Sequence, residues 1–261
     1  MKCNYHTHNE MCGHAGGTIE DYVKCAVANQ MEEIGMSDHI PYPGDVFGMR
    51  MPYSRLEEYI NQTLKLKEKY RGQIKVLLGM EAEYLTNYDD YYKQLLEQKG
   101  VEYLILGQHF YVSEDGAMSN VYSDMHSTVE CISYVKNCID AMNTGYFAYI
   151  AHPDLMFIND FQVDDSVKMA IDMLLNEAVK RDYILELNAN GFRRGKSRFL
   201  SGERYPYPAD FFWKEVAKSG VRTIIGADCH SVDALCDEAI VQGENMAREL
   251  SLNLVEKLEI V

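Results

Sequence analysis

The chain has 261 residues, of which 47% are hydrophobic and 25% are charged, and these values are typical of a folded domain with a sizeable core. Its formal net charge of −15 argues against a nucleic acid as the main partner, because nucleic-acid binding requires a basic surface. The same charge permits a small anionic substrate if bound divalent cations reverse the local potential.

The start of the chain has no basic stretch followed by an apolar run, and no segment reaches membrane-spanning length, so we expect a cytoplasmic protein with no membrane partner. The seven cysteines form no CxxC pair, which indicates reduced, mostly buried thiols. Cys12 and Cys229 stand next to histidines. We favour packing beside a site over metal ligation for both.

Short apolar runs alternate with amphipathic helical patterns along the whole chain. In residues 76–78, 104–106 and 223–225 the apolar residues are continuous, as in strands that helices bury on both faces. The predicted strands are residues 2–8, 34–38, 74–80, 103–110, 146–151, 183–188 and 222–227.

The segments between these strands carry helix-start signals of the capping-box type. The capping patterns are Thr18-x-x-Asp21, Ser54-x-x-Glu57 and Ser127-x-x-Glu130, and further helices are expected to begin near Asn87, Asp164, Pro208 and Ser231. Strand–helix alternation without a linker predicts one α/β domain over residues 1–261, in which seven parallel strands can close into a TIM-like barrel. A doubly wound open sheet is the alternative, although no Gly-rich phosphate loop follows the first strand.

Seven of the eight histidines lie at, or just after, the C-terminal end of a predicted strand: His6, His8, His14, His39, His109, His152 and His230. In an α/β barrel the strand C-termini meet on one face, so these side chains are expected to lie together. Glu81 ends the third predicted strand and Asp228 ends the seventh, and a carboxylate can bridge two cations. Each histidine alone is explained as a loop or surface residue, but the joint pattern predicts a metal site. His126 is the exception, expected in a surface loop, with a substrate contact as the alternative.

A basic segment follows the sixth predicted strand, with five Lys or Arg residues between Arg193 and Arg204. Guanidinium groups match phosphate oxygens bidentately and keep their charge, so Arg193, Arg194 and Lys196 are the predicted substrate-binding residues. A solvated loop that pairs with the acidic surface is the alternative interpretation.

These motifs together resemble those of the polymerase and histidinol phosphatase (PHP) superfamily over nearly the full chain. The motifs are His6-x-His8, His14, Ser37-Asp38-His39, Gly79-Met80-Glu81, Gly107-Gln108-His109, His152-Pro153-Asp154 and Asp228-x-His230. The histidinol-phosphatase type is the most similar subgroup, because residues 36–41 and 186–193 resemble its pattern.

The resemblance implies a distorted seven-stranded (β/α)7 barrel that holds three divalent metal ions, which are zinc, manganese or iron. Glu81 would bridge the first two metals, and Glu83 would orient a histidine from outside the ligand set. The implied ligands are His6, His8, Glu81 and Asp228 for the first metal, Glu81, His109 and His152 for the second, and His14, His39 and His230 for the third.

The predicted function is metal-dependent hydrolysis of a small phosphate monoester, with L-histidinol phosphate, an intermediate of histidine biosynthesis, as the leading substrate. Asp228, His230 and Arg193 are the predicted catalytic residues, and Asp38 is a candidate proton donor. The alternatives are another phosphomonoester, a phosphotyrosyl peptide or a phosphodiester, an amidohydrolase reaction, or a non-catalytic metal-binding module.

Two departures from the subgroup pattern concern the substrate rather than the metals. Subgroup members tend to have a basic residue near the His-x-Asp segment, whereas residues 154–158 contain none. The fourth motif reads Gly107-Gln108-His109 in place of a longer Gly-Ser-x-His. A second phosphate ligand is therefore unassigned.

Overall fold

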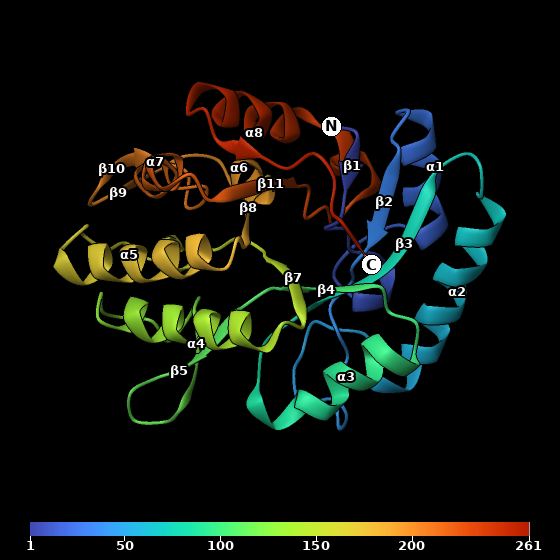
Figure 1. Cartoon of the computed structure of the whole chain (residues 1–261), viewed down its shortest axis with the longest axis horizontal. Helices are drawn as coiled ribbons and strands as arrows, with labels where there is room; N and C mark the ends of the chain where they lie inside the picture. The colour runs from blue at the N-terminus through green and yellow to red at the C-terminus, as the bar shows by residue number, and fades with distance from the viewer. Residues whose placement is uncertain (261) are drawn as a thin grey trace.

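The computed structural model describes residues 1–260 and contains one curled parallel sheet with helices on its outer face (Figure 1). Neighbouring strands follow the chain in the order β1-β2-β3-β4-β7-β8-β11-β12, with parallel pairing throughout. The strands are β1 Cys3–Asn4, β2 Glu33–Met36, β3 Lys75–Ala82, β4 Tyr103–Leu106, β7 Phe147–Ile150, β8 Ile184–Asn188, β11 Arg222–Gly226 and β12 Asn253–Leu254.

Helices connect successive strands of the sheet and cover its outside. They are α1 Ile19–Ala28, α2 Leu56–Lys69, α3 Asp89–Gln98, α4 Glu130–Thr144, α5 Asp165–Lys180, α6 Asn190–Arg193, α7 Asp210–Ser219 and α8 Glu238–Glu249. Short 3-10 helices lie at Glu10–Cys12, Tyr53–Arg55, Thr86–Tyr88, Leu155–Ile158 and Val232–Cys236, and two hairpins are formed by β5 Phe110–Val112 with β6 Met118–Asn120 and by β9 Ser197–Phe199 with β10 Gly202–Arg204. Within residues 1–260, no helix is long and apolar enough to cross a membrane.

All seven predicted strands are present, but the sheet has an eighth strand, β12, so the predicted strand count was one too few. The doubly wound alternative is wrong because the strand order never reverses along the sheet. At the C-terminal ends of the strands, Thr7 forms an isolated parallel bridge with Cys229, which links the two sides of the curled sheet. At the opposite end β12 pairs with β11 instead.

The predicted capping box is fully formed at α1, where Thr18 accepts a hydrogen bond from the Asp21 amide and Asp21 accepts one from the Thr18 amide. At α4 the carboxylate of Glu130 accepts from the Ser127 amide, which is one half of the predicted box, but the helix begins at Glu130 after Val129 and has no side-chain cap. Helix α2 begins at Leu56 without a side-chain cap, so the Ser54 prediction is wrong.

The inside of the curled sheet is filled by apolar side chains toward the N-terminal ends of the strands. Tyr5, Leu77, Tyr103, Ile105 and Tyr149 belong to this inner cluster, and Leu258 of the C-terminal segment packs against them. Because alternate residues of a strand share a face, the inner positions beyond this apolar layer are occupied by the side chains of the candidate site.

A buried carboxylate ties the C-terminal segment to the first strands. Glu33 is only 1% exposed, and it accepts a hydrogen bond from Tyr5 Oη at 2.7 Å while Lys257 Nζ and Lys75 Nζ lie at 2.5 and 3.3 Å. Burial alone would raise the pKa of Glu33, but Lys257, Tyr5 and Lys75 outweigh it and hold the pKa below its ordinary value of 4.5.

A Glu33→Gln substitution tests this contribution to stability. Because the folded pKa of Glu33 is lowered, its stabilisation is complete above the unfolded pKa and is lost as the pH falls through the folded pKa. We expect Glu33→Gln to reduce the free energy of unfolding by about 2 kcal/mol at neutral pH. The difference in the free energy of unfolding between Glu33→Gln and the parent should become smaller at acidic pH. Urea titrations in the presence of chelator measure it. The exposed neighbour gives the control variant Glu32→Gln, and an equal loss in both variants would contradict the assignment.

Candidate metal centre

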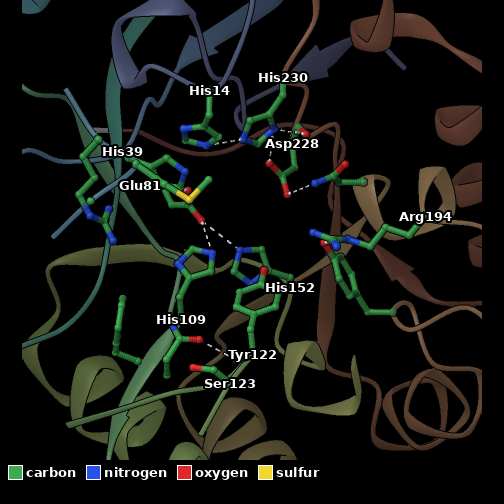
Figure 2. Close-up of a pocket in the computed structure, with 17 residues that line it drawn as sticks. His14, His39, Glu81, His109, Tyr122, Ser123, His152, Arg194, Asp228 and His230 are labelled. Carbon is green, nitrogen blue, oxygen red and sulfur yellow. Dashed lines mark hydrogen bonds and ion pairs between the residues drawn. The ribbon is translucent and has the colours of Figure 1, made fainter. Parts of the chain in front are cut away.

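The nine predicted metal ligands lie together at the C-terminal ends of the strands (Figure 2). Eight of them follow the strands β1, β2, β4, β7 and β11, and Glu81 lies within β3, so separate parts of the chain supply one cluster. Six of them are buried or nearly so, and His14, His109 and His230 are partly exposed. The prediction that one face of the sheet would gather these side chains is therefore confirmed.

The centre of the cluster is formed by His6, His8, Glu81 and Asp228. The two Nε2 atoms of His6 and His8 lie 3.2 Å apart. His8 Nε2 is 3.2 Å from Asp228 Oδ1 and 3.4 Å from Glu81 Oε2, and His6 Nε2 is 3.6 Å from an oxygen of each carboxylate. These atoms face one common point.

Two further groups adjoin this centre and share Glu81 or His8 with it. On one side, Glu81 Oε1 lies 3.0 Å from His152 Nε2 and 3.8 Å from His109 Nε2. On the other, His14 Nε2 and His230 Nε2 lie 3.1 Å apart, and the ring of His39 is 5.2 Å from that of His14. His39 Nδ1 also lies 2.8 Å from Glu81 Oε2.

Most of these imidazoles are oriented by an acceptor on the opposite side of the ring. Nδ1 of His6 lies 2.8 Å from Glu186, Nδ1 of His8 lies 3.2 Å from Asp38, and Nδ1 of His109 lies 2.9 Å from Glu83. His14 and His230 donate from Nδ1 to the backbone carbonyls of Cys12 and Asp228. When these rings are neutral, the hydrogen-bond network assigns the proton to Nδ1 and leaves Nε2 as a free lone pair.

The donor set fits divalent metal ions. Two unprotonated Nε2 atoms cannot bond to each other, and two nitrogens bound to one ion at about 2.0–2.1 Å lie about 3 Å apart. The His6–His8 and His14–His230 separations match that spacing. His39 Nδ1 and Glu81 Oε2 are buried without a hydrogen-bond partner despite their short separation, as expected for two ligand atoms that face a cation. Imidazole and carboxylate suit zinc, manganese and iron.

Local backbone features make room for these side chains. A Cβ at Gly107 would collide with the Glu81 carboxylate, and one at Gly226 would collide with Glu186, so glycine is required beside each acid. His152 and Asp228 have positive φ angles of 33° and 42°, which non-glycine residues rarely adopt. Such strain is typical of functional sites, where surrounding contacts fix a residue in place.

The two carboxylates of the cluster are strongly held in the ionised form. Burial alone would raise the pKa of Glu81, but His39, His6 and His152 outweigh it and hold that pKa well below its usual range. The same balance lowers the pKa of Asp228, with His6 and His8 as the main partners. The cluster thus presents anionic oxygens and free nitrogens, which divalent cations bind.

The cluster forms the floor of a cavity of about 640 Å³. Besides cluster residues, the cavity is lined by Arg50, Phe110, Tyr122, Asn190, Arg194 and Tyr207, together with Gly48, Met49, Asn120 and Ser123. Figure 2 shows Arg194 pointing toward the cluster from the side opposite His39 and Glu81. The Arg194 guanidinium lies over the rings of Tyr122 and Tyr207, and its Nε donates to Tyr207 Oη at 3.1 Å.

The prediction that Arg193 binds the substrate is not supported by its contacts. Its guanidinium donates to Asp237 Oδ2 at 2.8 Å and to the carbonyl oxygens of Ala227 and Ala234 at 2.6 and 2.7 Å. It is absent from the cavity wall, whereas its neighbour Arg194 lines it. Lys196 also lies outside the wall, with Nζ over the Tyr205 ring.

The other candidate residues lie around the cluster rather than in the cavity. Asp38 stands behind His8, which disfavours it as the proton donor to a leaving group. His126 is exposed in the loop before α4, as predicted. Cys12 Sγ donates to the Asn9 carbonyl, and burial raises the pKa of its thiol to about 12, which favours packing. Its sulfur also lies close to ligand atoms of His8 and Asp38, so ligation stays the alternative.

Several residues of the site were not predicted, including Glu186, Arg50, Tyr122 and Tyr207. Glu186 carried one signal, because an acid in the middle of a buried strand requires a partner. Arg50, Tyr122 and Tyr207 lie in loops, where the sequence gives no periodicity to place them.

Comparisons with known proteins agree with this arrangement. A family model described as "PHP domain" matches residues 4–190. A Deinococcus radiodurans protein named "Probable histidinol-phosphatase" is 25% identical over 243 residues, covering 87% of this chain and 86% of the relative. The Bacillus subtilis histidinol-phosphatase is 23% identical over 258 residues, covering 88% and 94%.

A solved structure has a similar fold. It is the histidinol phosphate phosphatase from Lactococcus lactis, crystallised with zinc, L-histidinol and phosphate. The TM-score is 0.72 at 17% identity, and the match covers 98% of this chain and 96% of that chain.

A Glu186→Gln substitution tests the orientation of the ligands. Glu186 Oε2 accepts hydrogen bonds from the His152 amide and from Asn188 Nδ2, and Oε1 lies 2.8 Å from His6 Nδ1. A glutamine has only one acceptor oxygen, so its NH2 group would face either the two donors or His6 Nδ1, and it would repel the N–H groups there. We expect metal affinity to fall roughly 10- to 100-fold. The metal retained after dialysis against increasing chelator concentrations measures this affinity. Glu203→Gln, at an exposed position, is the control variant. Unchanged metal retention would show that Glu186 does not support the site.

Proposed function

The chain belongs to the PHP domain family, and we propose that it hydrolyses L-histidinol phosphate to L-histidinol and phosphate with divalent metal ions as cofactors. The observation that carries the proposal is the convergence of seven imidazoles and two carboxylates beneath an arginine-lined cavity. The named activity of the similar proteins supplies the substrate. A decayed, non-catalytic module would be expected to have lost part of this ligand set.

We assign the ligands to three ions, within a curled sheet that we interpret as a distorted barrel of seven strands extended by β12. His6, His8, Glu81 and Asp228 would hold the first ion. Glu81 would bridge to a second ion held with His109 and His152, and His14, His39 and His230 would hold the third. The short distances within each group support this division.

Bound divalent ions in this cluster would polarise the phosphate, neutralise its charge and lower the pKa of a water molecule. Arg194 supplies the complementary cation of the protein. Among residues 1–260, its terminal nitrogens donate to no protein acceptor, and its guanidinium lies over the rings of Tyr122 and Tyr207. Two parallel N–H groups of Arg194 would therefore hold two phosphate oxygens.

Asp228 and His230 lie beside the reacting phosphate in this arrangement. Asp228 lines the cavity, and Asn188 and Asn190 donate to its Oδ2 at 3.1 and 3.2 Å, which fixes Oδ1 toward the cluster. We assign Asp228 as the acceptor of the proton released by the attacking water. Burial and the nearby His8 lower the pKa of His230 to about 4, so His230 is neutral at physiological pH and suited to ligation.

Phosphate release from a panel of esters tests the activity. We expect the metal-loaded protein to hydrolyse L-histidinol phosphate faster than phosphotyrosyl peptide or phosphodiester, because the cavity is small and the protein is strongly acidic. Chelator should abolish release, and added zinc or manganese should restore it. Release from other esters alone would preserve the chemistry and change the substrate. An absence of bound metal and of chelator-sensitive release would contradict an enzymatic function.

Arg194→Met and Arg193→Met distinguish two adjacent arginines. Because Arg194 faces the cavity, Arg194→Met should weaken inhibition by inorganic phosphate and raise KM roughly 10- to 100-fold, with metal content unchanged. Arg193→Met should instead lower the free energy of unfolding by about 2 kcal/mol, because it leaves Asp237 and two carbonyl oxygens without their donor. A larger effect of Arg193→Met on phosphate inhibition would reverse the assignment.

A further inference from the structure

Arg50 places a second guanidinium in the cavity, from the long loop between β2 and α2. Its side chain is only 7% exposed, and the guanidinium lies 5.7 Å from the Tyr42 ring centre and 5.3 Å from that of Phe47. One terminal nitrogen, Nη2, donates to Glu83 Oε1 at 2.7 Å. The group is therefore buried, charged and fixed in orientation before any ligand binds.

The hydrogen-bonding capacity of Arg50 is mostly unused. The bond to Glu83 is the only one its guanidinium makes within residues 1–260, and its Nε is buried without a partner. A buried guanidinium normally satisfies its donors, because each unpaired polar group has lost its bonds to water. The unused donors and the place of Arg50 in the cavity wall together indicate a ligand that supplies an acceptor.

The surroundings of Arg50 indicate what kind of ligand this is. The Phe47 ring, beneath the guanidinium, packs 4.9 Å from the ring of Phe110, which with Met49 lines the cavity. The only carboxylates in the wall formed by the described residues, Glu81 and Asp228, both belong to the metal cluster. This part of the wall is thus apolar, with one cationic donor and no free acid, and it suits a flat, uncharged ring with an acceptor atom.

We propose that Arg50 is a specificity-determining residue that donates a hydrogen bond to the unprotonated ring nitrogen of the substrate's leaving group while Phe110 and Met49 pack against that ring. The inference rests on the proposed function, in which the leaving alcohol carries an imidazole. In this proposal Arg194 binds the phosphate and Arg50 binds the ring of the leaving group. Residues 154–158 supply no basic side chain. Arg50 is a cavity-lining cation from a different part of the chain, outside the basic segment 193–204.

The experiment compares two substrates that share the amino-alcohol phosphate and differ in the ring, which is an imidazole with an acceptor nitrogen in L-histidinol phosphate and a phenyl group without one in L-phenylalaninol phosphate. The parent protein should prefer the imidazole ester, because a donor left unpaired against a phenyl ring costs its full desolvation. Arg50→Met should reduce this preference, measured as a ratio of kcat/KM values, roughly 10- to 100-fold. Calorimetric binding of L-histidinol to the metal-loaded protein should weaken by a similar factor, which gives a readout independent of turnover.

Two further variants separate recognition from structure. Arg50→Lys keeps a cation for Glu83 but lacks the planar guanidinium. This variant should retain metal and lose much of the preference for the imidazole ester. If Arg50→Met does not fold, Arg50→Lys is the variant that tests the proposal. Arg55→Met removes a neighbouring arginine that pairs with Glu58 outside the cavity, and its substrate preference should equal that of the parent. Metal content and inhibition by inorganic phosphate are measured for every variant.

The possible outcomes are distinct. A reduced preference with unchanged metal content and unchanged phosphate inhibition supports the proposal. Weaker phosphate inhibition in Arg50→Lys would make Arg50 a phosphate ligand, and metal loss would make it a support for Glu83 and His109. Either result, or an unchanged preference, overturns the proposal. If the parent protein fails to bind L-histidinol or hydrolyse its phosphate, the proposed function fails first, and that result is visible before any variant is compared.

Discussion

The fold is organised around the burial of Glu81. This carboxylate is 1% exposed and lies within 4 Å of nitrogens from His6, His8, His39, His109 and His152. A buried charge must be compensated, because its transfer out of water costs several kcal/mol even after relaxation. Charge on the surrounding imidazoles compensates it in part and holds the pKa of Glu81 well below its usual range. Divalent cations bound here would complete the compensation, which would couple metal binding to stability.

The residues on the inner face of the sheet explain how the charged cluster and the apolar core lie next to each other. Along β3, the inner positions read Leu77, Gly79, Glu81 and, just after the strand, Glu83. Leu77 belongs to the apolar layer, and Gly79 gives space to the Tyr103 ring that covers it. The strands thus change from apolar to glycine to carboxylate as they approach the cavity, and the glycines allow the acids to lie close together. The metal centre therefore rests on a packed, dry layer.

The sequence was sufficient to predict seven of the eight strands of the sheet and the side chains that gather at their C-terminal ends, because both depend on local signals. Continuous apolar runs identify buried strands, and parallel strands must end on the same face, which brings distant histidines together. Other features depend on contacts that no local pattern encodes. The pairing of Glu186 with His6 spans 180 positions, and β12 is a two-residue strand. Arg193 and Arg194 are identical and adjacent, but successive residues at the end of α6 point in different directions, so only the structure separates an internal ion pair from a cavity ligand.

The division of roles between arginines follows from how each is held. Arg194 is exposed at the cavity, and it is restrained only by one hydrogen bond to Tyr207 and two aromatic faces. Such a group can adjust as the phosphate geometry changes during hydrolysis. Arg50 is buried and bound to Glu83, which in turn orients His109, so its movement would disturb a metal ligand. A fixed donor suits the part of the substrate that does not change during the reaction. The rigid arginine therefore belongs with the leaving group's ring, and the adjustable one belongs with the phosphate.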